Sequence, residues 1–594
     1  MVKHQPLQVY ERQLCLSCLT GIYGCRWKRY QRSHDDSSKW ECSWFFLLCC
    51  SFLLLLVWSY FWLEARNDYN EFNWLLYNHS AVWKDGTVPI LATTLTGFTY
   101  TAFLMILALC HIVLGQQLNL YWIHKIVVLA ILLTTITGVV SIDDFWQDEW
   151  DIVIISLQFT GPFLHIGALA VVTALGWVIA GQVVRVERSR LQVVMLVIYV
   201  SLLLVLYLVP LFISSPCITD RSKLGPRPAV IGRRGAPMVS FIILVLNPVP
   251  VTCLATIRNL DGVPFLMRDR TLRRTTNVDK LFPARQDHDA SFFNWTEIRS
   301  LNAGLWFLRD DPYWTVQYMS EKDRNRTANQ TVCSLAELLR LAARTNRSVI
   351  FSLRRPPAQH PRHQLWVSDA LKVIQRSSIL PEHVMWTPDW YRKKVRAAVP
   401  LLKQTSDEKL PVAELKERGI STLTLHYSQA RAQDISRQFS GSNVSVNVYP
   451  VNEPWLYSLM WCSGVQSVSS DAPHILKKVP NPVWIMSADE YGLIWITSDL
   501  ISVAIVMGIF IFQNYHLIRW KMSGMRSYNP EQVMLSAVVR RPSRDVNLMK
   551  EKLIFSEINN GVGSTDEFSV FTGNGLDTYS CDDIMTPARQ ATKL

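Results

Sequence analysis

The chain has 594 residues, 49% of them hydrophobic, and a formal net charge of +12. It is too long for one ordinary domain, and its mean hydropathy of +0.12 is high for a soluble protein. The positive charge does not indicate nucleic-acid binding, because many of the Lys and Arg residues flank apolar segments, where anionic lipid head groups attract them. The composition therefore predicts a membrane protein with the phospholipid bilayer as its partner, and no nucleic acid.

Six apolar runs come close to the roughly 20 residues that cross a bilayer. They span residues 44–63, 88–115, 125–142, 152–180, 193–213 and 493–512. Basic residues precede the first run, fill 183–192 and follow the last run, whereas the loop 143–151 is acidic and has no Lys or Arg. Because basic flanks stay in the cytosol, both termini are expected inside and the acidic loop outside. No cleavable signal peptide is expected at the N-terminus.

These runs divide the chain into five parts. We expect a cytosolic segment (1–43), five membrane helices (44–214), an outer domain (215–490), a sixth helix (491–512) and a cytosolic tail (513–594) that is disordered at its end. Every Asn-x-Ser/Thr sequon falls in a segment that the charge pattern places outside the cell, either in the outer domain or in the loop after the first apolar run, which predicts a glycosylated protein of the plasma membrane. The sequon residues are Asn78, Asn294, Asn325, Asn329, Asn346 and Asn443.

The cytosolic ends contain possible regulatory positions. Cys15 and Cys18 form a Cys-x-x-Cys pair, and Cys25 follows before the first span. Lipidation near the membrane, a redox pair and ordinary reduced thiols all remain open for these cysteines, while a metal site is disfavoured because no second Cys/His pair stands at zinc spacing. In the tail, Ser543 follows two arginines, a context that basophilic kinases accept.

The outer segment has about the length of a (β/α)₈ barrel, which is ~250 residues. Short β-branched runs at 348–353, 421–427 and 444–451 alternate with helical patterns such as 334–344, where Ser334 is a good N-cap. Alternating strands and helices predict a parallel sheet that closes as a barrel. The fold class expected is thus a six-span α-helical membrane protein with an extracellular α/β TIM-barrel domain.

Several motifs narrow this expectation. They are "IGRRGAP" (231–237), "DGVPFLMRDRTLRRTT" (261–276), "LNAGLWF" (301–307), "SLAELL" (334–339) and "VNEPW…GVQSVSSD" (451–471). In order and spacing they resemble the glycerophosphodiester phosphodiesterase family. The N-terminal segment, the arrangement of spans and the start of the tail resemble the six-span members of that family.

The resemblance implies a TIM barrel that holds a divalent metal, Ca²⁺ or Mg²⁺, and two histidines. One histidine acts as general base and the other as general acid, and together they cleave a phosphodiester next to a free hydroxyl. The membrane-tethered members act outside the cell on glycerophosphodiesters and on glycosylphosphatidylinositol (GPI) anchors, and they are linked to neuronal differentiation. The substrate that the resemblance implies is therefore a glycerophosphodiester or a GPI-anchor-type phosphodiester.

This chain departs from the family at the residues that carry the chemistry. Arg233 and Arg268 stand where the family has its two histidines, and guanidinium, with a pKa above ~12, does not shuttle protons at neutral pH. Arg234 stands at the position where the family has an arginine that contacts the phosphate, and Ser352 lies near the position of a glutamate in the family. Residues 239–260 contain no carboxylate. The family metal is therefore not expected to bind, because it needs several oxygen ligands.

Two hypotheses follow. In the first, the gene encodes a metal-dependent ectophosphodiesterase and this sequence is a damaged or misassembled version, with noncoding or frame-shifted sequence replacing an exon within 239–260. In the second, the chain is a pseudoenzyme that acts as a phosphate-binding or protein-binding receptor. A transporter is disfavoured, because the spans lack paired ionisable residues. Protein partners are unknown from sequence.

Overall fold

A computed structural model describes residues 40–80, 82–113, 118–185, 189–233, 251–388, 391–430 and 442–526, with a few further positions in 19–25 and 435–439. Six helices in this part of the chain are long and apolar enough to cross a membrane. They are α2 (Trp40–Glu64), α4 (Thr87–Val113), α5 (Trp122–Phe145), α6 (Asp151–Arg185), α7 (Ser189–Leu208) and α20 (Ala488–Arg526). Each contains most of one predicted apolar run.

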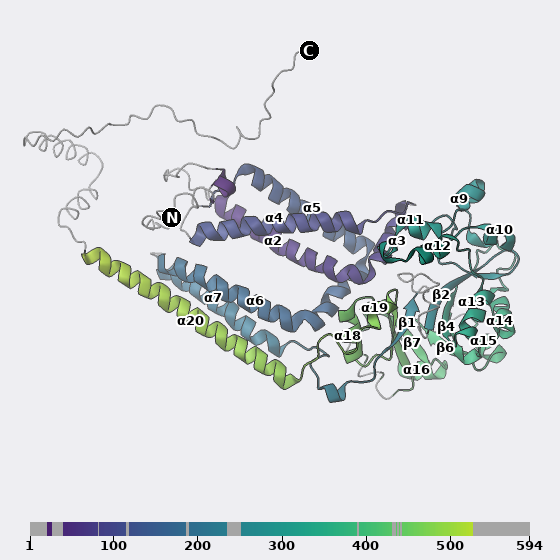
Figure 1. Ribbon diagram of the computed structural model, residues 1–594. Coiled ribbons are helices and arrows are strands. Elements are labelled where there is room, and N and C mark those ends of the chain that lie inside the picture. Colours follow the sequence, from purple (N-terminus) through teal and green to yellow (C-terminus); the bar gives the residue numbers. More distant parts are fainter. Residues whose placement is uncertain are drawn as a thin grey trace, which may run out of the picture.

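The long helices form two groups in Figure 1. One group contains α2, α4 and α5, and the other contains α6, α7 and α20. Four of these helices, α2, α5, α6 and α20, extend past both ends of their apolar runs, because polar residues at helix ends also take part in the helical hydrogen bonding. The remaining domain lies at one end of the bundle, next to the short helix α3 (Tyr69–Ser80) that follows α2.

Eight parallel strands form the centre of this domain. They are β1 (Ala229–Arg233), β2 (Val251–Arg258), β4 (Ser348–Leu353), β5 (Val384–Trp386), β6 (Lys403–Ser406), β7 (Thr422–His426), β8 (Ser445–Tyr449) and β9 (Ser467–Ser470). Each strand pairs with the next, and β1 pairs with both β9 and β2, so the pairings form a ring. The short strand β3 (Pro264–Leu266) is antiparallel to β2. The sequence predicted this ring of alternating strands and helices.

The segment that departs from the family supplies a strand of the ring. Residues 251–258 form β2, which pairs with β1 and β4 in parallel. This part of the segment therefore contributes a strand that closes the ring. After it, Gly262 has a φ of +89° in the turn that leads to β3, a conformation that favours glycine.

Helices cover the outside of the ring between successive strands. They include α13 (Leu335–Arg344), α14 (Trp366–Arg376), α15 (Arg392–Ala398), α16 (Val412–Glu417), α18 (Pro454–Cys462) and α19 (Pro473–Leu476). The predicted helix at 334–344 is α13, and Ser334 caps it in a capping box with Glu337. An excursion between β3 and α13 contains α9 (Val278–Leu281), α10 (Trp295–Ser300), α11 (Leu305–Asp310) and α12 (Glu321–Ala328).

The bundle and the domain share one hydrophobic core. A single cluster of buried apolar side chains contains Trp62 and Phe72 from the first helical segment together with Leu425 and Leu456 from the domain. A disulfide between Cys217 and Cys462 ties the start of the domain to α18. Because α3 takes part in this packing, residues just after the first span lie against the domain.

Candidate functional site

The carboxyl ends of the parallel strands bring the predicted positions together. Arg233 is the last residue of β1, and Ser352 lies near the end of β4. Ile231 and Ile350, two residues earlier on each strand, pack together in one cluster. Side chains two residues apart on a strand share a face, so Arg233 and Ser352 lie at the mouth of the ring. Active sites of (β/α)₈ barrels lie at this end.

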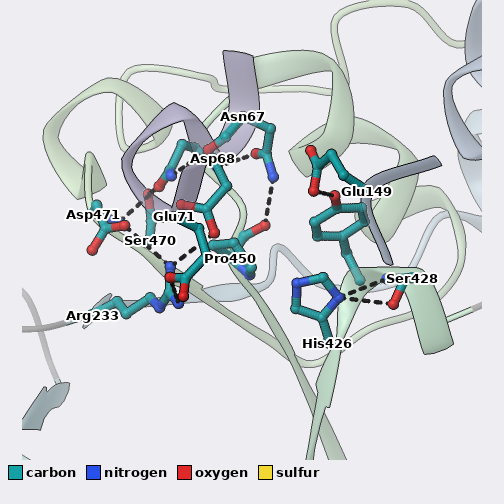
Figure 2. A network of polar contacts seen from close by, with 12 residues as sticks. Asn67, Asp68, Glu71, Glu149, Arg233, His426, Ser428, Pro450, Ser470 and Asp471 are labelled. Atoms are coloured by element: carbon teal, nitrogen blue, oxygen red, sulfur yellow. Dashed lines mark hydrogen bonds and ion pairs between the residues drawn. The ribbon is translucent and has the colours of Figure 1, made fainter. Parts of the chain in front are cut away.

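Arg233 is held by carboxylates. Its Nη1 lies 3.3 Å from Oδ2 of Asp68 and 3.3 Å from Oδ2 of Asp471. Its Nη2 lies 3.8 Å from Oε2 of Glu71. The side chain of Arg233 is 14% exposed, that of Asp68 is 3% exposed and that of Asp471 is fully buried. Figure 2 shows the three carboxylates gathered around the guanidinium, which is therefore a buried counter-ion.

Two of these carboxylates come from outside the ring. Asp68 ends the 3₁₀ turn η2 (Ala65–Asp68), and Glu71 lies in the first turn of α3. Asn67 anchors this segment to the domain: its Nδ2 donates to the carbonyl of Pro450 at 2.9 Å, and its Oδ1 accepts from the backbone N–H of Asn452 at 2.8 Å. The segment that follows α2 thus supplies acidic groups to the barrel end.

The third carboxylate is positioned by the same asparagine pair. Asp471 directly follows β9, and its backbone N–H donates to Oδ1 of Asn452 at 2.7 Å. The Nδ2 of Asn452 donates to the carbonyl of Asn67 at 2.6 Å. Asn452 therefore links the segment after α2 to the end of β9. Asp68 and Asp471 lie beside the guanidinium of Arg233 (Figure 2).

Arg268 lies at the more open side of the same cluster. Its Nη2 is 3.0 Å from Oε2 and 3.2 Å from Oε1 of Glu71, and its guanidinium lies 4.7 Å from the ring of Trp74. The side chains of Arg268 and Glu71 are 32% and 28% exposed. The two arginines thus share Glu71, but solvent reaches only the Arg268 side of it to an appreciable extent.

Arg274 reinforces the contact with α3. It forms two hydrogen bonds with Asp269, at 2.6 and 3.0 Å. Its guanidinium lies 5.2 Å from the ring of Trp74, 5.0 Å from that of Trp83 and 4.8 Å from that of Trp306. Trp74 is therefore in contact with two arginines, Arg268 and Arg274, and this cation–π arrangement fixes α3 against the domain.

His426 adds an imidazole at the end of β7. Burial, together with the positive charge of Arg233, lowers the pKa of His426 to about 4. Its Nδ1 lies 2.8 Å from the hydroxyl of Ser428, and its ring lies 5.6 Å from that of Tyr449. The neighbouring Tyr427 donates to a carboxylate oxygen of Glu149, a residue of the acidic loop 143–151. Because its pKa lies well below 7, the imidazole of His426 is neutral at pH 7.

Comparison with known proteins places this arrangement in a family. Residues 260–475 match the Glycerophosphoryl diester phosphodiesterase family. Over 594 residues the chain is 55% identical to glycerophosphodiester phosphodiesterase domain-containing protein 5 from Gallus gallus. The match covers 99% of this chain and 98% of that protein. The chain belongs to the glycerophosphodiester phosphodiesterase family.

More distant relatives match less of the chain. Over 507 residues it is 38% identical to a glycerophosphoinositol inositolphosphodiesterase from Mus musculus, covering 84% of this chain and 93% of that protein. A solved phosphodiesterase structure from Oleispira antarctica, in complex with sn-glycerol-3-phosphate, is 18% identical with a TM-score of 0.34, and covers 43% of this chain and 97% of that one.

The described residues do not fit the divalent metal that the family implies. Among them, no three His, Cys, Asp or Glu side chains form a group able to hold a metal ion. The physical reason lies in the cluster itself, because the guanidinium of Arg233 occupies the space among the carboxylates of Asp68, Asp471 and Glu71. Ser352 lies near the position where the family has a glutamate, and its hydroxyl group carries no negative charge.

Sequence reasoning found the arginines of this site and missed three of their neighbours. Asp68, Glu71 and His426 were not singled out. The acidic pair has a weak signal in the sequence, since residues three apart on a helix share a face. Nothing in the sequence shows that this face lies against β1. His426 lies at the end of β7, within the predicted strand at 421–427, but no sequence motif around it marks the imidazole as part of a site.

Among the residues that the structure describes, the other predicted positions take no part in this cluster. All six sequon asparagines are exposed in the structure. Cys25 is disulfide-bonded, so its thiol is not available for lipidation. Cys217 is paired with Cys462, whereas Cys333 is a free thiol. Arg234, Cys15, Cys18 and Ser543 lie outside the residues that the structure describes.

Proposed function

We propose that this chain is a six-span protein of the plasma membrane whose outer domain binds glycerophosphodiester or GPI-anchor-type phosphodiester groups without hydrolysing them. Both termini are cytosolic in this proposal. The observation that carries the loss of hydrolysis is the ion cluster around Arg233. A guanidinium held by Asp68 and Asp471 at 3.3 Å neither exchanges protons nor leaves the carboxylates available to a metal.

Arg268 is the residue that supports anion binding. Its partner Glu71 is partly exposed, and exposed ion pairs contribute only about 0–1 kcal/mol. A phosphodiester oxygen can therefore replace the Glu71 carboxylate at small cost, because arginine binds phosphate in the same forked geometry. Arg233 is unsuited to this exchange, since its carboxylate partners Asp68 and Asp471 are buried.

Hydrolysis is the alternative function, and two observations favour it. The relatives are named phosphodiesterases, and His426 provides a neutral imidazole near Arg233. A single base lacks the proton donor for the leaving alcohol, so the binding function is supported better.

Binding is tested by calorimetric titration of the full-length protein, in detergent, with glycerophosphoinositol. We expect saturable binding that is weakened about tenfold or more in Arg268→Gln, since a lost charged hydrogen bond contributes about 1.5–3 kcal/mol. Arg270→Gln is the matched control, because Arg270 is 75% exposed and pairs with Asp289 instead. Equal affinity in all three proteins would show that Arg268 is not the anion contact.

The membrane arrangement has its own test. Endoglycosidase treatment of the protein expressed in animal cells, after labelling of the cell surface, should lower the mass of the labelled band. The exposed positions of the six sequon asparagines support this expectation. A surface protein whose mass does not change would contradict the proposed glycosylated outer domain.

A further inference from the structure

Glu71 occupies the anion contact of Arg268. Its Oε1 and Oε2 lie 3.2 and 3.0 Å from Nη2 of Arg268, so both carboxylate oxygens face the guanidinium. A phosphate group also presents two oxygens to an arginine. The side chains of Arg268 and Glu71 are 32% and 28% exposed, so a dissolved ligand reaches this pair. Glu71 is therefore a carboxylate of the chain itself at the place where the oxygens of a ligand bind.

The position of Glu71 is set by the helix that carries it. Trp74 lies three residues further along α3 on the same face, and its ring lies 4.7 Å from the guanidinium of Arg268 and 5.2 Å from that of Arg274. Before α3, Asn67 forms two hydrogen bonds with the backbone of the domain. A displaced Glu71 carboxylate therefore stays close to the site, because its backbone is held on both sides.

Arg233 offers the displaced carboxylate a second partner. Its Nη2 lies 3.8 Å from Oε2 of Glu71, the same oxygen that lies 3.0 Å from Nη2 of Arg268. A rotation of the glutamate side chain toward Arg233 thus frees Arg268 and keeps the carboxylate paired. A tethered group of this kind competes with a dissolved ligand, because the chain itself fixes its effective concentration.

The charges around the site favour a singly charged ligand. Arg233 and Arg268 lie among the carboxylates of Asp68, Glu71 and Asp471, so these five residues have one more negative charge than positive. A phosphodiester has one negative charge, whereas a phosphomonoester, with a second pKa of about 6, has nearly two above about pH 7. The displaced Glu71 carboxylate repels this second charge. At about 4 Å in water, one extra pair of like charges weakens binding about fivefold.

We infer that Glu71 is a specificity-determining residue of the anion site. It pairs with Arg268 when no ligand is bound, and it selects phosphodiesters over phosphomonoesters when one binds. This role rests on the anion contact at Arg268 proposed above. Because Glu71 lies on α3, the ligand removes one contact that holds α3 at the barrel end, and any change that moves α3 away from the barrel end raises the affinity for the ligand.

The test is calorimetric titration of the full-length protein in detergent, at about pH 7.5, with glycerophosphoinositol and with inositol monophosphate. Glu71→Gln removes the competing charge and should raise the affinity for the diester about two- to fivefold, as for the loss of an exposed ion pair. The affinity for the monoester should rise about fivefold more than that for the diester. Glu414→Gln is the matched control and should change neither affinity, because Glu414 is 38% exposed and pairs with Arg418 on α16.

Glu71→Asp separates the effect of charge from that of structure. This variant keeps a carboxylate on α3, so its preference for the diester should stay within about twofold of that of the wild type. If Glu71→Asp and Glu71→Gln lose the preference for the diester equally, the charge of Glu71 does not set the selectivity.

The Arg268→Gln background shows whether Glu71 competes for Arg268. In this background Glu71→Gln should no longer raise the affinity for the diester, because competitor and ligand no longer share a contact. An equal rise in both backgrounds would overturn the competition. If Arg268→Gln itself leaves the affinity unchanged, the anion contact fails. If Arg268→Gln weakens binding and Glu71→Gln changes neither affinity, the anion contact stands and the role of Glu71 fails.

Discussion

Arg233→Met tests whether this arginine is a structural counter-ion. The substitution removes the guanidinium and leaves Asp68 and Asp471 buried, with 3% and 0% exposure. Removing one partner of a buried ion pair costs about 3–5 kcal/mol, because the remaining charge is uncompensated. At about 2–4 °C per kcal/mol for a domain of this size, the fall in melting temperature is roughly 6–20 °C.

Arg268→Met is the matched comparison. Arg268 and Glu71 are both about one third exposed, so water solvates the glutamate that the substitution leaves behind. The expected cost is about 0–1 kcal/mol, or a few degrees. Thermal unfolding of the full-length proteins in detergent, followed by intrinsic tryptophan fluorescence, measures both variants under the same conditions.

A compensating variant sharpens this prediction. Combining Arg233→Met with Asp68→Asn and Asp471→Asn removes the buried negative charges, so the melting temperature should recover part of the loss. If Arg233→Met melts within about 2 °C of the wild type, the guanidinium does not neutralise the buried carboxylates, and the reasoning from the cluster is wrong.

Three further predictions follow from the described contacts. Asn67→Ala removes hydrogen bonds to the domain and should cost about 2–3 kcal/mol, seen as faster proteolysis after the first span; an unchanged rate would contradict the anchoring role. The pKa of His426 is lowered from 6.5 to about 4 in the fold, so the unfolded state takes up a proton first as the pH falls. The free energy of unfolding should therefore be highest above about pH 6.5 and fall toward pH 4, and His426→Gln should flatten this dependence in melting curves. Cys217→Ser removes the disulfide to Cys462 and should lower stability by about 2–5 kcal/mol in denaturant titrations, and an unchanged midpoint would refute this.

The secondary structure of the domain was largely accessible from sequence, because its signals are local. The capping box of Ser334 fixes the start of α13, and β-branched runs mark β4 and β7. Hydropathy likewise located the six long helices, since a span is defined by its own composition.

The partners of the arginines were not accessible in this way. Asp68 meets Arg233 only because α3 packs against the ring, and this packing depends on contacts between segments far apart in the chain, such as Asn67 with Asn452. Periodicity reports which residues share a face but not what that face contacts. The low pKa of His426 likewise arises from burial and from Arg233, both of which are tertiary effects.

The barrel end of this chain is expected not to hydrolyse phosphodiesters, because Arg233 and Arg268 stand where the family has its histidines. Phosphorus NMR of the full-length protein with glycerophosphoinositol, in the presence of Mg²⁺ or Ca²⁺, follows substrate and product in one sample. We predict no product above the protein-free blank with either metal. If the wild-type chain forms product and His426→Gln does not, the barrel end is an active hydrolase with His426 as its base, and the proposed loss of hydrolysis is wrong.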